Sequence, residues 1–272
     1  ELIFLGGNMD LYINTLLEMK NKIEKDLADS GEFFYEDRPP KDEIRIKGKN
    51  DFVTEVDVKV QEYLKAKLLN ILPHAQFIAE EKNNDDIDIN KLTWILDPCD
   101  GTTNLVHGYK HSSISLGLAK DGKILLGMIY DPHTKELFWA IKEYGAFLGE
   151  KPIRVSNINN LKDALCAIGA GGFRINRTEE TFDMIKGLFL NSQGIRRIGS
   201  AALEMCYVAS GRTDAFLEED LNIWDFAAGL LILKEAGALV KDFHGNDLIL
   251  KRKSGVICAN PSLLRELEIY YY

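Results

Sequence analysis

The chain of 272 residues is long enough to bury a full hydrophobic core and to form one large domain or two closely joined lobes. Apolar residues make up 46% of it and charged residues 28%, which excludes a disordered or fibrous protein. The formal net charge of -9 argues against a nucleic acid or an anionic membrane surface as the main partner, so a phosphate-bearing ligand would need cations to reverse the local sign.

The ends of the chain and its cysteines carry no targeting or zinc-binding signal. Residues 1–8 lack the basic and apolar segments of a signal peptide, and Met9 resembles a natural first residue, so we expect residues 1–8 to be an added segment. The terminal Tyr270, Tyr271 and Tyr272 are set aside in the same way. The four cysteines are widely spaced, no C-x-x-C or H-E-x-x-H pattern occurs, and no apolar run reaches the roughly 18 residues of a membrane span. These features predict a cytoplasmic protein with buried free thiols.

In the first half of the chain the hydrophobic pattern changes from helical to strand-like. Apolar residues at helical spacing predict one helix over Leu11–Leu27 and another over Val56–Ile71. The polar stretch Gly31–Asn50 between them predicts a long, mobile connection. Short apolar runs then predict strands at Gln76–Ala79, Thr93–Leu96, Ser113–Ala119, Ile124–Tyr130 and Leu137–Ile141. Asp121-Gly122 between two of these runs is typical of a hairpin, so part of the sheet is predicted to be antiparallel.

The second half alternates strands and helices. Strands are predicted at Ala164–Gly169, Thr213–Leu217 and Val256–Ala259. Helices are predicted at Glu179–Leu190, Ala201–Ala209 and Asp225–Ala236, with a short one from Pro261. Together the elements predict a mixed α and β protein built in layers.

Two aspartates follow the predicted strand Thr93–Leu96. In the segment Asp97–Gly101, D-P-C-D-G, Pro98 and Gly101 indicate a sharp turn. Such a turn can aim both carboxylates and a backbone carbonyl at one point, the oxygen-rich environment that Mg²⁺ prefers. The N–H groups of Gly101 and Thr102 can then hold a phosphate at the start of a helix. The alternative interpretation is an Asx-type turn with no ligand.

Further acidic residues lie at the ends of other predicted elements. Glu80 and Glu81 end an apolar strand, where adjacent carboxylates repel each other unless one meets a cation. A solvated strand end explains this pair as well. Asp225 follows Trp224 at the start of an apolar helix, in the place of an N-cap, and capping alone would account for it.

In combination, these segments resemble the inositol monophosphatase family, from about Asp51 to the C-terminal helix. The family's two long signatures resemble D-P-C-D-G-T-T-N-L-V-H-G at Asp97–Gly108 and W-D-F-A-A-G-L-L-I-L-K-E-A-G at Trp224–Gly237. Shorter family segments resemble N-D-F-V-T-E-V-D at Asn50–Asp57, Ala79-Glu80-Glu81 and the G-S-A-A run at residues 199–202. Two departures are Cys99, where an aliphatic residue is more usual, and Ala238, where the second signature often has a glycine.

The resemblance implies the fold and the assembly. The expected fold is of the α+β type, a layered α/β/α/β/α sandwich like that of inositol monophosphatases and sugar phosphatases, usually found as a homodimer. An N-terminal lobe, residues 9–150, would carry most metal ligands. A C-terminal lobe, residues 151–272, would carry Asp225 and the substrate contacts.

The resemblance also implies a role for each site residue. The implied metal ligands are Glu80, Asp97, the carbonyl of Cys99, Asp100 and Asp225. The residues that would orient or activate the attacking water are Asp57, Glu80 and Thr102. The substrate would contact Asp100, Gly101, Thr102, Gly199, Ser200, Ala201, Glu218 and Asp225. Two or three Mg²⁺ ions would polarise the phosphoryl oxygens and lower the pKa of a water, so that no phosphoenzyme is needed, and Li⁺ would inhibit.

The implied reaction is hydrolysis of inositol monophosphate or a similar polyol or sugar phosphate. Fructose-1,6-bisphosphatases, NADP phosphatases and nucleoside 3',5'-bisphosphate phosphatases share the same metal core and remain alternatives. Glu218 favours a polyol monophosphate, because a carboxylate accepts hydrogen bonds from hydroxyls and repels a second phosphate. A non-catalytic regulatory or RNA-associated member is a further alternative, against which the complete acidic set and the negative charge weigh.

Overall fold

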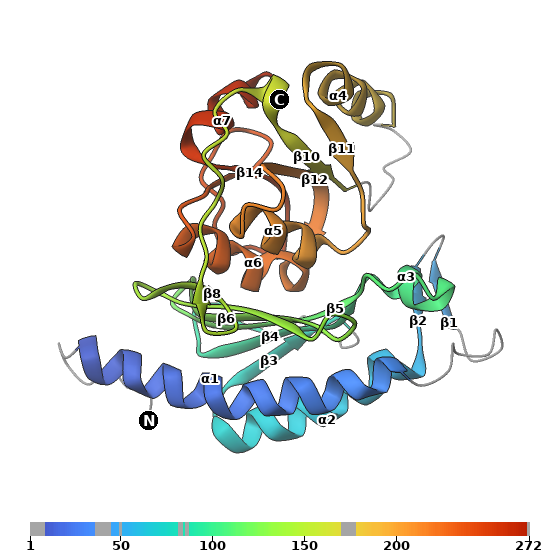
Figure 1. The fold of residues 1–272 in the computed structure, drawn as a ribbon. Helices are drawn as coiled ribbons and strands as arrows, with labels where there is room; N and C mark the ends of the chain where they lie inside the picture. Colours follow the sequence, from blue (N-terminus) through green and yellow to red (C-terminus); the bar gives the residue numbers. More distant parts are fainter. Residues whose placement is uncertain are drawn as a thin grey trace.

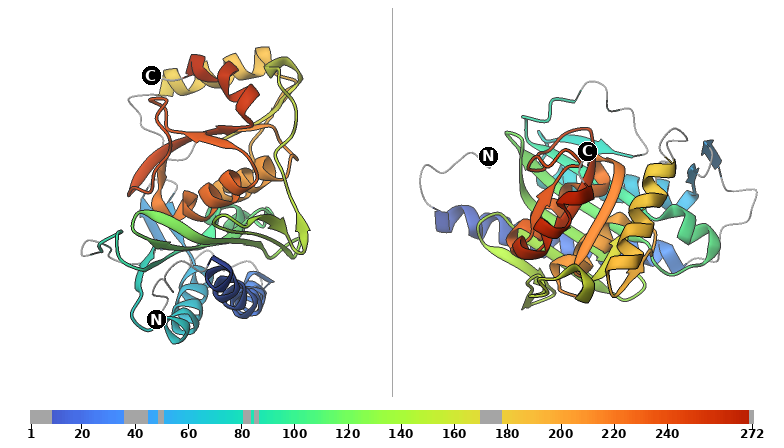
Figure 2. Two further views of the ribbon diagram at one scale, coloured as in Figure 1. Left: turned by 90° about the vertical axis from the view of Figure 1, so that its left-hand side faces the viewer. Right: turned by 90° about the horizontal axis from the view of Figure 1, so that it is seen from above.

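The helices and sheets stack in five layers (Figure 1), and the turned views in Figure 2 show the same order. The structure is a computed structural model that describes residues 9–35, 45–48, 51–80, 84, 87–169 and 178–270. Helices α1 (Met9–Gly31) and α2 (Glu55–Ile71) cover one face of a seven-stranded sheet. Helices α5 (Ala201–Ala209) and α6 (Ile223–Glu235) lie between it and a five-stranded sheet, whose far side carries α4 (Thr178–Asn191) and α7 (Pro261–Glu266). The predicted α/β/α/β/α sandwich is confirmed.

The seven-stranded sheet follows the order of the chain. Its strands are β3 (Gln76–Ala79), β4 (Thr93–Asp100), β5 (Ser113–Lys120), β6 (Lys123–Asp131), β7 (Glu136–Ile141), β8 (Gly145–Leu148) and β9 (Lys151–Pro152). Only β3 and β4 pair in parallel, and every other neighbouring pair is antiparallel. The β5–β6 turn places Asp121 and Gly122 at φ 52 and 68, as a type I′ turn requires. The predicted hairpin is therefore confirmed.

The five-stranded sheet mixes parallel and antiparallel pairs. Its order is β11 (Gly194–Arg196), β10 (Leu165–Ile168), β12 (Ala215–Asn222), β14 (Lys253–Ala259) and β13 (Leu239–Lys241). β10 runs parallel to both of its neighbours, whereas β14 is antiparallel to β12 and β13. The sequence pattern does not predict β8, β9, β11 and β13, because each has only two to four residues and shows no hydrophobic period.

The stretch Gly31–Asn50 is more regular than predicted. Among its described residues, a 3₁₀ helix η1 (Glu32–Tyr35) follows α1, and strand β1 (Arg45–Gly48) pairs with β2 (Asp51–Val53). These parts of the predicted connection therefore have regular structure, and its predicted mobility stays a prediction. Residues 36–44 and 49–50 lie outside the described residues, as do residues 1–8, so the predictions made for them stay predictions.

The hydrophobic core is divided by the seven-stranded sheet. Along β4, Trp94 packs with α1 and α2 on one side, while Ile95 packs with α6 on the other, as strand alternation requires. Helix α6 lies between the two sheets, and nine of its thirteen residues are buried. This burial explains why its sequence is apolar on nearly every side. All four cysteines are buried and free, which confirms that prediction. No helix among the described residues is long and apolar enough to cross a membrane.

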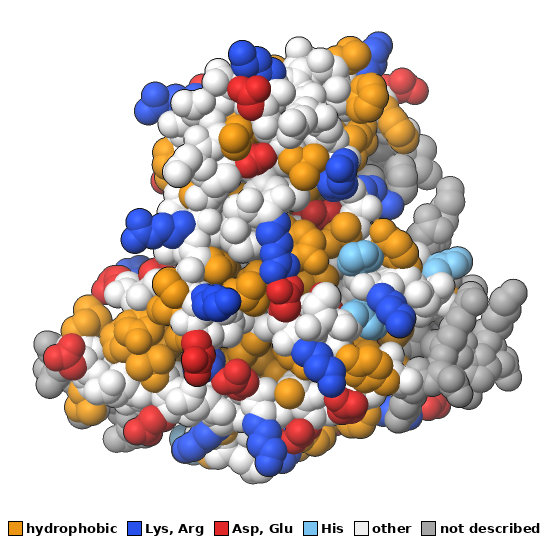
Figure 3. Space-filling view, viewed as in Figure 1, with side chains coloured by type: hydrophobic (Ala, Val, Ile, Leu, Met, Phe, Trp, Pro, Cys, Tyr) orange, Lys and Arg blue, Asp and Glu red, His pale blue; other side chains and the backbone are white. Residues whose placement is uncertain are grey.

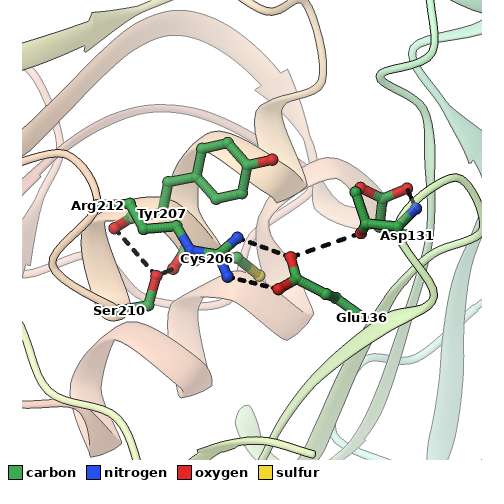
Figure 4. Close-up of polar contacts among 7 residues, drawn as sticks. Asp131, Glu136, Cys206, Tyr207, Ser210 and Arg212 are labelled. Carbon is green, nitrogen blue, oxygen red and sulfur yellow. Dashed lines mark hydrogen bonds and ion pairs between the residues drawn. The ribbon is translucent and has the colours of Figure 1, made fainter.

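An ion pair joins the turn that follows α5 to the seven-stranded sheet (Figure 4). Both terminal nitrogens of Arg212 donate to the carboxylate of Glu136, at 2.7 and 2.5 Å. The guanidinium also lies over the rings of Phe138 and Tyr207, 5.4 and 5.2 Å from their centroids. Two-pronged bonding of this kind fixes orientation as well as distance. It therefore helps hold α5, whose other end reaches the acidic site.

Candidate active site

Strand β4 continues through both aspartates of the D-P-C-D-G segment. Asp97 is paired with Ser115 of β5 and Asp100 with Ser113, with a bulge between them. The bulge accommodates Pro98, which has no N–H to donate to a sheet. The predicted strand end at Leu96 is thus wrong, because pairing with β5 extends four residues further. As a result the carboxylates are buried, Asp97 with 2% and Asp100 with 8% of its surface exposed.

Gly101 turns the chain from β4 into the short helix α3 (Thr102–His107). Its φ is 92, a left-handed conformation that favours glycine. A Cβ on this residue would lie 3.0 Å from the carbonyl oxygen of His111 and 3.1 Å from that of Gly199. The turn therefore needs glycine for both conformation and space. It places the N–H groups of Gly101 and Thr102 at the start of α3.

Thr102 is linked to Asp57, which lies 45 residues earlier in the chain. Its hydroxyl lies 2.9 Å from Oδ1 of Asp57 and 3.0 Å from the carbonyl oxygen of Cys99. Oδ2 of Asp57 accepts hydrogen bonds from the backbone N–H and the hydroxyl of Thr54, at 2.9 and 2.5 Å, which caps α2. Asp57 is fully buried, and burial raises the pKa of its carboxyl, while its hydrogen bonds to Thr54 and Thr102 lower it. The capping box thus fixes a carboxylate beside Thr102.

Asp100 contacts the first turn of α5. Its Oδ2 accepts hydrogen bonds from the hydroxyl of Ser200 at 2.5 Å and from the backbone N–H of Ala202 at 2.8 Å. Ser200 is the N-cap of α5, so the G-S-A-A segment lies directly against the acidic segment. Burial raises the pKa of Asp100 to about 6, although these hydrogen bonds lower it.

Asp225 lies at the third position of α6 and not at its N-cap. The N-cap is Asn222, whose backbone N–H donates to Oδ2 of Asp225 at 2.7 Å in a capping box. The predicted N-cap position is therefore wrong by three residues. The pKa of Asp225 is raised to about 8, first by burial and then by the negative charge of Asp100, with a smaller contribution from Glu218. Glu218 itself is buried in β12 with 7% of its surface exposed.

The acidic side chains form one electrostatic cluster. The pKa of Asp97 is raised well above its usual value by burial and by the charges of Glu80, Asp100 and Asp225. Within the described ranges, no group of three or more His, Cys, Asp or Glu residues already has metal-binding geometry. The donor set nevertheless fits a hard divalent cation, because several mutually repelling carboxylates gather at the end of β4, the strand that also carries the carbonyl of Cys99. A cation would neutralise the repulsion that, after burial, adds to the raised pKa values of Asp97 and Asp225.

Two polar residues hold the site together but are not assigned a role by the sequence. Nδ2 of Asn104 donates to the carbonyl oxygens of His111 and Ile198, at 2.6 and 2.7 Å. The buried Glu204 accepts a hydrogen bond from the backbone N–H of Ile198 at 2.8 Å. Asn104 thus binds the carbonyl oxygen of Ile198 and Glu204 binds its N–H, which fixes the backbone just before Gly199. The sequence offers one signal for each of these residues. Asn104 lies inside the first signature, and Glu204 is the only charged residue in the apolar helix α5.

The structure brings all the predicted site residues into one region. Gly199 lies against Asn104, whose amide would be 3.3 Å from a Cβ on the glycine. The backbone of Ala201 reaches Asp100, like that of Ala202. The roles of these residues in binding and catalysis remain predictions.

Comparison with known proteins identifies the family. The family model described as "Inositol monophosphatase family" matches residues 18–270. The chain belongs to the inositol monophosphatase family, which confirms the resemblance.

Individual relatives agree with this assignment. The inositol-1-monophosphatase of Rhizobium meliloti is 36% identical over 228 residues, covering 83% of this chain and 85% of the relative. The Nus factor SuhB of Vibrio cholerae is 39% identical over 215 residues, covering 79% and 80%. The solved structure of an IMPase from Thermotoga maritima has a TM-score of 0.84 and 31% identity, covering 93% of this chain and 96% of that one.

Proposed function

We propose that this protein is a Mg²⁺-dependent phosphomonoesterase that hydrolyses inositol monophosphate or a similar polyol or sugar phosphate with water. The observation that carries this proposal is the buried acidic cluster of β4 and α6 beside the linked pair Thr102 and Asp57. An acidic cluster alone would serve structure poorly, because its charges repel one another. Next to a helix start and a positioned hydroxyl, it suits phosphoryl transfer.

The cation would be held by the oxygens of the acidic cluster. We assign as ligands Glu80, Asp97, the carbonyl of Cys99, Asp100 and Asp225. Mg²⁺, when bound there, would neutralise charge on the phosphate and stabilise the leaving alkoxide. We expect two or three ions for each site from the family alone.

Thr102 and Asp57 are proposed to position the water. When the Thr102 hydroxyl donates to Asp57, its oxygen lone pairs are available to accept a hydrogen bond from water. Asp57 cannot turn away, since Thr54 holds its other oxygen with two hydrogen bonds. The N–H groups of Gly101 and Thr102 would hold the phosphoryl oxygens in line with that water.

The alcohol part of the substrate is proposed to face α5 and the end of β12. Ser200, Ala201 and Glu218 lie on this side, with Asp100 and Asp225 next to them. Carboxylates accept hydrogen bonds from sugar or polyol hydroxyls and repel a second phosphate. This favours a polyol monophosphate over the bisphosphates and dinucleotides of the related branches.

A regulatory function is the second candidate, because several relatives are named Nus factor SuhB. The net charge of -9 does not favour direct nucleic-acid binding. On the face shown in Figure 3, basic and acidic side chains are interspersed and form no continuous basic patch. We therefore place hydrolysis first.

A phosphate-release panel tests the proposed function. Inositol 1-phosphate, glycerol phosphate, glucose phosphates, fructose 1,6-bisphosphate, NADP and adenosine 3',5'-bisphosphate are each incubated with Mg²⁺ and with EDTA. We expect fastest release from a polyol or sugar monophosphate and none with EDTA. The variant Asp97→Asn, purified in parallel, controls for contaminating phosphatases. Release no faster than that of this variant for every substrate would favour the regulatory function.

We also propose a homodimer, on family analogy alone. Light scattering at working concentration should give twice the chain mass. A monomer mass would refute this part of the proposal without affecting the chemistry.

A further inference from the structure

Gly169, which directly follows β10, has no space for a side chain. Its backbone N–H donates to the carbonyl oxygen of Leu217 at 2.9 Å and so extends the parallel pairing with β12. A Cβ on Gly169 would overlap Cδ and both carboxylate oxygens of Glu218, all well inside the 3.0 Å that real Cβ atoms keep from other atoms. The carboxylate of Glu218 thus fills the place where residue 169 would carry a side chain.

Space, and not backbone conformation, is what requires glycine here. The φ of Gly169 lies outside the left-handed region, unlike that of Gly101 or Gly199. An alanine could therefore adopt this backbone without strain. The overlapping group is the far end of a side chain and not backbone, so in an alanine variant it is the Glu218 carboxylate that must shift.

The position of the Glu218 carboxylate matters for the site. Its side chain is buried, and its charge contributes to the raised pKa of Asp225. The parallel register of β10 and β12 sets where Gly169 lies relative to Glu218. Ile168 is paired with Leu217, and these two residues directly precede Gly169 and Glu218. Hydrogen bonds weaken steeply with displacement, so an acceptor pushed aside by a methyl group would meet substrate hydroxyls poorly.

We propose that Gly169 is a positioning residue that sets the preference for the alcohol part of the substrate by leaving room for the Glu218 carboxylate. This inference rests on the proposed function, since it concerns the alcohol side of the same site. Gly169 acts through Glu218, whose carboxylate occupies the place of a Cβ at residue 169. Substitution should therefore alter discrimination between alcohols more than phosphate hydrolysis itself.

The test compares a hydroxyl-rich substrate with one that lacks alcohol hydroxyls. For Gly169→Ala, the ratio of kcat/KM for inositol 1-phosphate to that for p-nitrophenyl phosphate should fall on the order of 10- to 100-fold, the usual effect of losing a hydrogen bond to a charged group. Gly194→Ala is the matched control. It lies in β11 of the same sheet, and its Cβ would meet no atom closer than 3.6 Å. That variant should keep the wild-type ratio.

A double-mutant cycle shows whether the effect passes through Glu218. In the Glu218→Ala background the obstructed carboxylate is gone, so adding Gly169→Ala should not change the ratio further. An unchanged ratio in the single variant, or the same fold-change in both backgrounds, would overturn the inference. If Gly169→Ala alone fails to fold, folding of the double variant would support the overlap, and misfolding of both would refute it. Absence of phosphate release by the wild type would instead refute the proposed function itself.

Discussion

Replacing Thr102 separates its two proposed functions. Valine keeps the branched shape and the backbone N–H that is proposed to bind phosphate. It lacks the hydroxyl that lies 2.9 Å from Asp57 and 3.0 Å from the carbonyl oxygen of Cys99. Serine keeps both the N–H and the hydroxyl. We therefore expect Thr102→Ser to retain much of the activity and Thr102→Val to lose most of it.

The magnitude follows from the bond that is lost. A hydrogen bond to a charged group contributes about 1.5–3 kcal/mol, and about 1.4 kcal/mol corresponds to a tenfold change in rate. Loss of a proton-transfer group costs about 10²-fold or more. The valine variant should therefore lower kcat by about 10²-fold while changing KM much less. Asp57 keeps both bonds to Thr54, so the loss of stability should stay near 1 kcal/mol, or roughly 2–4 °C in Tm.

The assay measures kcat, KM and Tm for the wild type and both variants. A valine variant with low kcat and near-normal Tm would support the proposed orientation of water. A valine variant that melts early yet turns over normally at low temperature would show that the hydroxyl serves only to cap and brace the turn.

Four further outcomes are expected. Asp225→Asn should stay folded, since an amide oxygen can still accept the hydrogen bond from the N–H of Asn222. It should lose most activity and most of the rise in Tm that Mg²⁺ produces. An unfolded variant would instead show that capping is the main role of this residue. In EDTA, the stability of the wild type relative to Asp225→Asn should fall as pH rises from about 4 to about 8. The cause is the raised pKa of Asp225, about 8, because the folded state keeps a proton that the unfolded state has already released. A Tm difference that stays constant with pH would contradict this. Glu204→Ala should lower kcat about tenfold, because it removes the acceptor for the N–H of Ile198. Glu204→Gln keeps an acceptor oxygen and should retain most activity. Equal losses in both variants would show that this hydrogen bond does not position the segment before Gly199. Phosphate release should be inhibited by LiCl but not by KCl at equal ionic strength, and equal rates in both salts would remove the expectation drawn from the family.

Elements with a clear hydrophobic period could be predicted from the sequence. Helix α5 has the predicted bounds, Ala201–Ala209, and α4 extends the predicted Glu179–Leu190 by one residue at each end. Short edge strands such as β9 carry no period, and only pairing with a neighbour defines them. The proposed division into lobes near residue 150 remains a prediction.

The site could be predicted in its residue types but not in its local geometry. Sequence signatures mark Asp97, Asp100 and Asp225, yet the length of β4 depends on pairing with β5, and the start of α6 depends on the Asn222 capping box. Contacts between distant segments are harder still. The close approach of the Glu218 carboxylate to Gly169 results from the parallel register of two strands. No local sequence pattern specifies that register.

A crystal structure grown with Mn²⁺ and phosphate would show whether the acidic cluster binds metal. Anomalous scattering locates the metal independently of any assumed ligands. We predict metal peaks bound by the carboxylates of Asp97, Asp100 and Asp225, with phosphate held by the N–H groups of Gly101 and Thr102. No metal at these carboxylates, under conditions in which the crystallised protein releases phosphate, would refute metal binding by the acidic cluster.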